Sequence, residues 1–393
     1  MPDKKIIYVD NNATTQMAPE VLDAMMPFMT EYYGNPSSTY PFSKKPADGI
    51  RSARKSMAEL LGCDPAEIIF TSCGSESDNT AIRSALATQS GRKKIVTTAV
   101  EHPAILNLCR NLEKQGFPVV YLGVDSKGRL NMDEAHAAID EDTAIVSVMH
   151  ANNETGTIFP IVELAEIAHQ NGALFHTDAV QSVGKVPICL RETKIDFLSL
   201  SGHKFHAPKG VGVLYRRRNT PYKPLLIGGH QERAQRAGTE NVTNIIGLGK
   251  AADLLLAGAT QEIAHIRKLR DRMEQGILAS CPDTFVNGDL ENRLPGTSNI
   301  AFQYIEGEAI LLHLYHDAGI CASSGSACTS DSLEASHVLQ AMGLPFQSLH
   351  GSVRFSFSRY NTEEDVDVIL AAMPKIVKTL RDLSPFGRMN ESK

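Results

Sequence analysis

The sequence predicts an α/β protein with a large domain built on a mostly parallel sheet and a smaller α+β domain. Over the first 240 residues, short apolar runs alternate with helix-length amphipathic stretches, a pattern typical of parallel sheets. Beyond about residue 240 two long helices precede a mixture of strands and helices. With 42% apolar residues in 393, the chain can bury a sizeable core. We expect a large domain at 15–258 and a small domain made of 1–14 with 259–393.

Buried strands in the first part are expected where short apolar runs end at polar or turn residues. These runs are 6–9, 68–71, 95–98, 119–122, 144–150, 174–177, 197–200 and 210–215, and the helical stretches between them include 47–61, 75–88, 103–115 and 161–171. In the second part we expect helices at 241–257 and 262–279, joined at Gly258 and Ala259, then strands at 284–286, 298–302 and 352–357 and a helix at 308–317. Thr362 and the acids after it predict the capped start of a closing helix.

Composition and missing motifs exclude several functional classes. The chain has 39 Lys+Arg and 45 Asp+Glu, a net charge of −6, whereas nucleic-acid-binding domains usually carry a basic excess. It contains no G-x-G-x-x-G, G-x-x-x-x-G-K-[ST], H-E-x-x-H or G-x-S-x-G. The sequence therefore has no motif that would support a dinucleotide-binding, P-loop, zincin or α/β-hydrolase mechanism. The N-terminus has no signal-peptide pattern and we find no apolar run of about 18 residues. We therefore expect a soluble cytoplasmic protein.

The seven cysteines are scattered along the chain, and no two have C-x-x-C spacing. This pattern favours free thiols over disulfides or a structural zinc site. Most are expected to pack as small apolar side chains, including Cys321 beside an apolar run. Cys328 differs, because the stretch 323–332 around it has no large apolar side chain to anchor it. We therefore expect an exposed loop with a nucleophilic cysteine.

A lysine and an aspartate follow two of the expected strands. Lys204 comes just after strand 197–200, and Asp178 ends the apolar run 174–177, with Gln181 three residues later. In open α/β sheets ligands bind beyond the carboxyl ends of strands, where both side chains would lie. Pyridoxal 5'-phosphate (PLP) needs such a pair, a lysine for its aldehyde and an acid for its ring nitrogen. Taken singly, Lys204 is better explained as a solvated loop lysine, and a helix N-cap explains Asp178 equally well.

Two further strand ends carry candidate ligand groups. Residues 71–78, Thr-Ser-Cys-Gly-Ser-Glu-Ser-Asp, place glycine and hydroxyls at a helix start, where free amides bind phosphate. His102 follows strand 95–98 and is able to stack on a flat ring. Arg354, in the strand at 352–357, is able to bind a carboxylate bidentately. A capped helix, a structural histidine and a surface cation are the simpler alternatives, but the convergence of several strand ends favours a site.

Motifs along nearly the whole chain make it similar to the cysteine desulfurases of the nitrogen-fixation (NifS-like) type, in the class V aminotransferase family. They are residues 8–15 (YVDNNATT), 34–38 (GNPSS), 100–103 (VEHP), 151–156 (ANNETG), 176–181 (HTDAVQ), 202–204 (GHK), 236–241 (RAGTEN) and the loop around Cys328 (SSGSACTS). The resemblance implies the PLP-dependent transferase fold, like that of aspartate aminotransferase. One departure is Ser75, where many relatives have threonine, and its hydroxyl is retained.

The resemblance also implies a role for each matching residue. Lys204 would bind the PLP aldehyde as a Schiff base, beside Gly202, while His102 would stack on the ring and assist proton transfer. Asp178 would pair with the ring nitrogen and Gln181 with the ring hydroxyl. The phosphate would be held by Gly74, Ser75, Ser201 and His203, with Thr239 from the other subunit of a homodimer. Asn153 and Arg354 would bind the substrate carboxylate, with Asn153 also beside the cofactor.

The implied activity is removal of sulfur from L-cysteine, giving L-alanine and a persulfide on Cys328 that supplies an iron–sulfur scaffold protein, with nitrogenase maturation as the pathway. Through its persulfide, Cys328 would also serve as a transient iron–sulfur ligand. No nucleic acid or membrane partner is expected. The alternatives are a class V transaminase acting on serine or phosphoserine, and a catalytically silent scaffold that passes sulfur or binds iron.

Overall fold

A seven-stranded sheet forms the centre of the computed structural model, which describes residues 5–324 and 335–384. Its strand order is β2-β8-β7-β6-β5-β3-β4. Strand β8 runs antiparallel to β2 and β7, and the other neighbouring pairs are parallel. The strands are β2 (Ile68–Thr71), β3 (Lys94–Thr98), β4 (Val119–Leu122), β5 (Thr143–Ser147), β6 (Leu174–Asp178), β7 (Phe197–Ser201) and β8 (Gly212–Arg216). The predicted mostly parallel sheet is confirmed.

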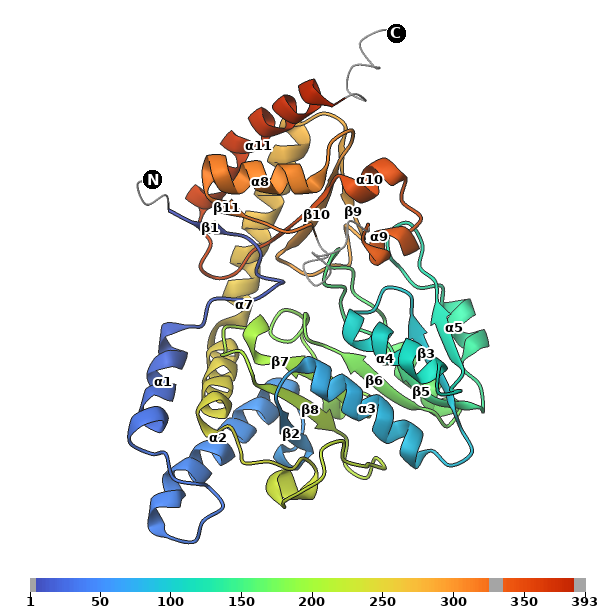
Figure 1. Ribbon diagram of the computed structural model, residues 1–393, viewed down its shortest axis with the longest axis vertical. Helices are drawn as coiled ribbons and strands as arrows, with labels where there is room; N and C mark the ends of the chain where they lie inside the picture. The colour runs from blue at the N-terminus through green and yellow to red at the C-terminus, as the bar shows by residue number, and fades with distance from the viewer. Residues whose placement is uncertain (1–4, 325–334, 385–393) are drawn as a thin grey trace.

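Helices cover both faces of this sheet (Figure 1). Alternate residues of a strand face opposite sides, so Ile69 and Phe197 belong to the core under α3 and α4, whereas Phe70 and Leu198 belong to the core under α2, α6 and α7. The helices are α2 (Lys44–Leu61), α3 (Gly74–Thr88), α4 (Pro103–Glu113), α6 (Ile161–Gln170) and α7 (Val242–Ser280). The sheet is thereby buried on both faces, as parallel sheets usually are.

The C-terminal part has its own sheet and its own hydrophobic core. Three antiparallel strands in the order β12-β10-β9 pack with α8 and α11, and the N-terminal β1 pairs in parallel with β11. Figure 1 shows this N-terminal segment lying beside the C-terminal elements. The bounds are β1 (Ile7–Tyr8), β9 (Thr284–Asn287), β10 (Thr297–Phe302), α8 (Gly307–Ala318), β11 (Ile320–Cys321), β12 (Ser352–Ser356) and α11 (Glu363–Leu383).

Helix α7 is a single helix of 39 residues, so the expected joint at Gly258 and Ala259 is wrong. Its first half packs in the core of the large sheet and its second half in the core of the C-terminal part. Nothing lies within 4 Å of the position that a Cβ on Gly258 would occupy. The glycine therefore lowers the helix propensity without ending the helix, because the packed residues on either side hold it. Residue 258 lies within a continuous helix that connects the two cores.

By length and composition, α7 is also apolar enough to cross a membrane, although no apolar run of that length was expected. In the structure one set of its apolar residues, including Leu248, Leu255 and Met273, is buried in the two cores, whereas Leu256 and Leu278 are exposed. Such packing is what the core helix of a globular fold requires. The length of the helix is explained by its passage through both cores.

Most expected elements lie within a few residues of the observed ones, and the capping box of Thr362 and Asp365 at the start of α11 is confirmed. Strand β5 ends at Ser147, shorter than expected. Within residues 5–324 and 335–384, four α-helices were not anticipated: α1 (Pro19–Thr30), α5 (Met132–Ala138), α9 (His337–Ala341) and α10 (Phe346–His350). Helix α1 begins with Pro19 and Glu20, which favour a helix start, but it has no side-chain cap and contains the helix-breaking Pro27.

Candidate active site

A cavity of about 230 Å³ lies beyond the carboxyl ends of β6 and β7. It brings together nearly all the residues expected to bind a cofactor. The lining residues are Ala13, Cys73, Gly74, Ser75, Asp78, His102, Met149, Ala151, Asn153, Asp178, Val180, Gln181, Ser201, His203 and Lys204. Gly202 is buried beside this lining in the 3-10 turn η4 (Gly202–Lys204) that follows β7. The convergence of several strand ends on one site, which the residue pattern predicts, is thus present.

Lys204 projects into the cavity from the end of η4. Its Nζ donates hydrogen bonds to the carbonyl oxygens of Asn12 and Ala13, at 2.6 and 2.9 Å. These carbonyls belong to the segment that connects β1 to α1. A half-buried amine held by carbonyl dipoles at a cavity wall is placed to react with an aldehyde.

Asp178 is the last residue of β6 and is 7% exposed. Its Oδ1 accepts a hydrogen bond from the backbone N–H of Val180, at 2.9 Å. Burial raises the pKa of this carboxyl to about 6, and the positive charge of Lys204 opposes the rise. A cationic ring nitrogen beside it would favour the ionised form in the same way.

His102 is the N-cap of α4, and its Nδ1 accepts the backbone N–H of Ala104 at 3.1 Å. Burial, and then the charge of Lys204, lowers its pKa to about 4. The ring is therefore neutral at physiological pH and holds its proton on Nε2, because Nδ1 is the acceptor. The residue combines a flat face for stacking with a defined tautomer for proton transfer.

Another part of the cavity wall is suited to a phosphate group. Helix α3 begins there at Gly74, and no side chain caps its free amides. A Cβ on Gly74 would lie 2.7 Å from Cγ2 of Val180, so a larger residue would crowd the wall at this point. The hydroxyls of Ser75 and Ser201 and the ring of His203 line the same cavity. With Lys204 and Asp178, this donor set fits PLP.

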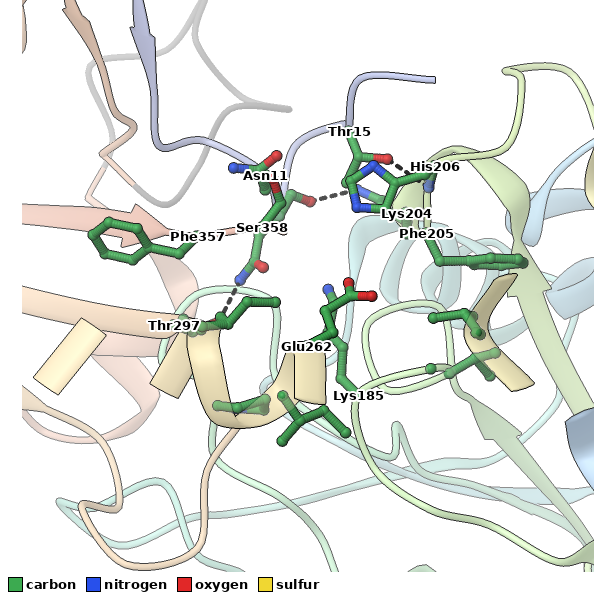
Figure 2. Close-up of a pocket in the computed structure, with 18 residues that line it drawn as sticks. Asn11, Thr15, Lys185, Lys204, Phe205, His206, Glu262, Thr297, Phe357 and Ser358 are labelled. Atoms are coloured by element: carbon green, nitrogen blue, oxygen red, sulfur yellow. Dashed lines mark hydrogen bonds between the residues drawn. The ribbon is translucent and has the colours of Figure 1, made fainter. Parts of the chain in front are cut away.

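A residue that the sequence analysis did not single out, Lys185, orients Gln181. The Lys185 Nζ lies 3.5 Å from the Gln181 Oε1, and the Gln181 Nε2 donates to the Asn12 carbonyl at 2.8 Å. Lys185 lines a second, smaller cavity with Lys204 and Glu262 (Figure 2). Burial lowers its pKa to about 7. No motif includes Lys185, and Lys204 and Glu262, which share its cavity, come from distant segments.

Arg354 is not part of the cavity wall, although Asn153 is. The guanidinium is 2% exposed, with Nη2 bonded to Asp10 Oδ1 at 2.7 Å and Nη1 to the carbonyl of Asn153 at 2.8 Å. It therefore lies directly behind Asn153. No sequence pattern pairs Arg354 with Asp10, because the two are 344 residues apart.

Cys328 lies outside the described residues. The described chain on both sides of 325–334 contacts residues that lie just behind the cavity wall. Ser323 pairs through its backbone with Arg354, and Ser336 donates to Glu154. His337 Nε2 lies 2.9 Å from the carbonyl oxygen of Glu101, next to His102.

Thr239 lines a different cavity, of about 200 Å³, with Glu232 and Arg236. Within one chain the structure does not bring it to the cofactor cavity. Cys321 is half-buried in β11, beside Asp10. Among the residues that the structure describes, no group of three His, Cys, Asp or Glu side chains is placed to hold a metal ion.

A family model described as Aminotransferase class-V matches residues 7–369. The chain is 58% identical over 381 residues to a "Cysteine desulfurase" from Nostoc sp., covering 97% of this chain and 95% of that protein. It is 56% identical over 385 residues to "Cysteine desulfurase NifS" from Azotobacter vinelandii, covering 98% and 96%.

Solved structures agree with this similarity. A structure named "NIFS-LIKE PROTEIN" superposes with a TM-score of 0.90 at 37% identity, covering 96% of this chain and all of that one. A NifS-like protein from Rickettsia africae gives 0.86 at 29% identity, covering 95% of this chain. The chain therefore belongs to the class V aminotransferase family, whose cofactor is PLP.

Proposed function

We propose that this protein is a cysteine desulfurase, which removes sulfur from L-cysteine and leaves L-alanine and a persulfide on Cys328. The observation that carries the proposal is the single cavity in which Lys204, Asp178 and His102 meet. The names of the relatives point to the same activity, and a similar solved structure is titled "SspA in complex with cysteine".

Each residue of the cavity would bind a different part of the cofactor. Lys204 would bind the aldehyde, Asp178 the ring nitrogen and Gln181 the ring hydroxyl, while His102 would stack on the ring. Gly74, Ser75, Ser201 and His203 would surround the phosphate, and Asn153 would lie beside the cofactor. When bound, PLP supplies an electron sink for charge that develops at the substrate Cα.

Side chains at the cavity would bind the substrate and transfer protons. Asn153 would hold the cysteine carboxylate, with the guanidinium of Arg354 directly behind it. The Nζ of Lys204, freed when substrate binds, would take the Cα proton. The Nε2–H of neutral His102 is a proton donor on the same wall.

Sulfur transfer needs a thiolate, because the thiol is a weak nucleophile. The Cys328 Sγ would attack the substrate sulfur, so that a sulfur–sulfur bond forms as the carbon–sulfur bond breaks. The electron pair of the broken bond remains with the substrate carbon, which takes a proton and leaves as alanine. The persulfide on Cys328 would then pass to an acceptor.

Mass spectrometry of the protein after incubation with cysteine tests this proposal. We expect one additional sulfur on the peptide containing Cys328, and alanine formed without a keto-acid acceptor. Cys328→Ala should retain the visible absorption of the bound cofactor but release no sulfide. Alanine formation that requires a keto acid, or full sulfide release by Cys328→Ala, would refute the proposal and favour a transaminase or another sulfur carrier.

A matched variant tests the lysine. Lys204→Ala should lose the visible absorption of the Schiff base, whereas Lys209→Ala, at an exposed position five residues away, should keep it. An unchanged spectrum in Lys204→Ala contradicts its role. A chain that lacks the absorption in every form would be a silent scaffold.

The wider setting that we propose follows the resemblance to the nitrogen-fixation type. The protein would act in the cytoplasm as a homodimer in which Thr239 reaches the partner's PLP phosphate. An iron–sulfur scaffold protein would accept the sulfur, with nitrogenase maturation as the pathway, and persulfidated Cys328 would be a transient iron–sulfur ligand. The large domain would comprise 15–258, and 1–14 with 259–393 would form the small domain.

A further inference from the structure

Asp78 is a buried acid in the cofactor cavity to which the proposed function gives no role. It lies on α3 one turn after Gly74, so both residues face the cavity. Its side chain is 1% exposed, and its Oδ1 has no hydrogen-bond partner among the described residues. Asp178 lines the same cavity from the end of β6.

Among the described residues, no lysine or arginine forms an ion pair with Asp78. Lys204 lines the same cavity, but its Nζ donates to the Asn12 and Ala13 carbonyls. His176 from β6 is its one ion-pair contact in the described chain, with Nε2 at 3.5 Å from Oδ1. His176 is itself neutral, because burial lowers its pKa to about 3. The other charged or titratable neighbours are Asp178 from β6, Glu101 from the segment between β3 and α4, and Cys73 at the N-cap of α3. An ionised Asp78 would thus be an unpaired buried charge beside other acids, which is strongly unfavourable.

A chain of hydrogen bonds under α3 leads to this acid. The ring of His176 contacts the Ser147 Oγ through Nδ1 at 2.8 Å and the Ser199 Oγ through Nε2 at 2.9 Å. Ser199 also hydrogen-bonds the Asp78 carboxyl. A neutral imidazole has one donor and one acceptor, so the two hydroxyls satisfy it in either direction of the chain. The chain therefore accommodates a proton on Asp78 without leaving the ring unpaired.

We propose that Asp78 is a protonated, neutral acid at physiological pH and a positioning residue that leaves Asp178 as the anion facing the cofactor ring nitrogen. The proton of the ring nitrogen would then face one negative charge, because two neighbouring buried carboxyls disfavour ionisation of both. Burial and the charge of Asp178 both raise the pKa of Asp78 well above its usual range. The proposal rests on PLP binding at this cavity but not on sulfur transfer by Cys328.

Infrared spectroscopy at pH 7 measures the protonation state directly, in the apo protein and in the holoenzyme without cysteine. We expect Asp78→Asn to remove a carboxylic-acid carbonyl band that shifts in D₂O. Loss of carboxylate bands instead would overturn the proposal. Glu101→Gln is the matched control, since it should remove a different acid band.

Two further measurements distinguish protonation from a merely structural role. In the wild-type protein, aspartate labelled with ¹³C at its side-chain carboxyl should show a protonated band at pH 7, and its absence contradicts the proposal without any variant. In the holoenzyme, the pH midpoint of the cofactor's visible absorption should be the same in wild type and Asp78→Asn, because both side chains are neutral. A shift of one pH unit or more would show that a negative charge had been deleted. A failure of sulfur transfer would leave all these readouts unchanged.

Discussion

At the scale of single residues, burial sets the protonation of the groups around the cofactor cavity. The imidazoles of His102 and His203 have pKa values lowered to about 4, and that of His176 is lowered to about 3. The carboxyls behave in the opposite way, because burial disfavours their charged form. The pKa of Glu101 is raised to about 8 and that of Asp178 to about 6. The neutral forms of most of these groups therefore prevail near neutral pH.

The pH dependence of stability should report the buried acid Glu101. Its folded pKa of about 8 exceeds the ordinary 4.5, so the folded state retains a proton that the unfolded state loses between these values. Its contribution to stability is complete below pH 4.5 and is lost as the pH rises towards 8, by up to about 1.4 kcal/mol per pH unit. Glu101→Gln cannot ionise and should lose less stability over this range.

Denaturant unfolding of the two proteins from pH 5 to 9 measures this difference. The exposed Glu163→Gln is the control and should follow wild type at every pH. Parallel curves for wild type and Glu101→Gln would contradict a proton on the buried carboxyl.

Arg354 should depend on the shape of its guanidinium as well as on its charge. It bonds Asp10 and the Asn153 carbonyl with two different nitrogens, which the single ammonium of lysine cannot reproduce with the same geometry. We expect Arg354→Lys to raise KM for cysteine by roughly 10- to 100-fold and to lower kcat less, because carboxylate binding is shared by ground and transition states. Steady-state kinetics decide this, and a fall in kcat at constant KM would be the contrary result.

Sequence reasoning at this scale succeeded where a residue type at a strand end already implied its chemistry. Lys204 and Asp178 follow apolar runs, so their place at the carboxyl edge of the sheet could be predicted. Asp78 and Asp10 could not be found, because their significance comes from partners on other segments, Asp178 and Arg354. Lys185 lies four residues from Gln181, but the cavity that it shares with Lys204 and Glu262 is formed by distant segments.

At the scale of elements, α7 shows how packing overrides local signals. Gly258 and Ala259 suggested a break, yet the helix continues through both cores. At other glycines of this helix, neighbouring atoms lie so close that they leave no room for a side chain. A Cβ on Gly249 would lie 2.5 Å from the Cα of Ala53 on α2, so the two helices approach closely there.

Two substitutions in α7 should therefore have opposite effects on the free energy of unfolding. Gly258→Ala meets nothing within 4 Å and should stabilise the protein by about 1 kcal/mol through helix propensity. Gly249→Ala should destabilise it by about 1–3 kcal/mol, because the backbone of α2 must move. Equal shifts in denaturant unfolding midpoints would contradict the close helix contact.

At the scale of the whole molecule, the site draws on both cores. The N-terminal strand β1 pairs with β11 in the C-terminal part, and the chain after it supplies the Asn12 and Ala13 carbonyls to Lys204. Arg354 on β12 reaches the same region from the small sheet. Movement of the C-terminal part would thus change the positions of Lys204 and of the residues proposed to bind the substrate carboxylate.

Mixed dimers test whether Thr239 acts across a subunit interface. Lys204→Ala and Thr239→Asp should each be inactive alone, the second because its carboxylate repels the phosphate. In a shuffled mixture, half of the dimers would contain one intact site, so about a quarter of the wild-type activity should return. No recovery would place Thr239 in its own subunit's site.

The sequence by itself determined the fold class, the strand ends that form the site and the chemistry of Lys204 and Asp178, because period and residue type are local properties. The tertiary structure decided that α7 is one helix, that Arg354 is held by Asp10 behind Asn153, and that Asp78 is buried beside Asp178. These depend on which distant segments meet and on how much water they exclude. Burial turns an ordinary carboxyl or imidazole into a neutral group, and no pattern along the chain records it.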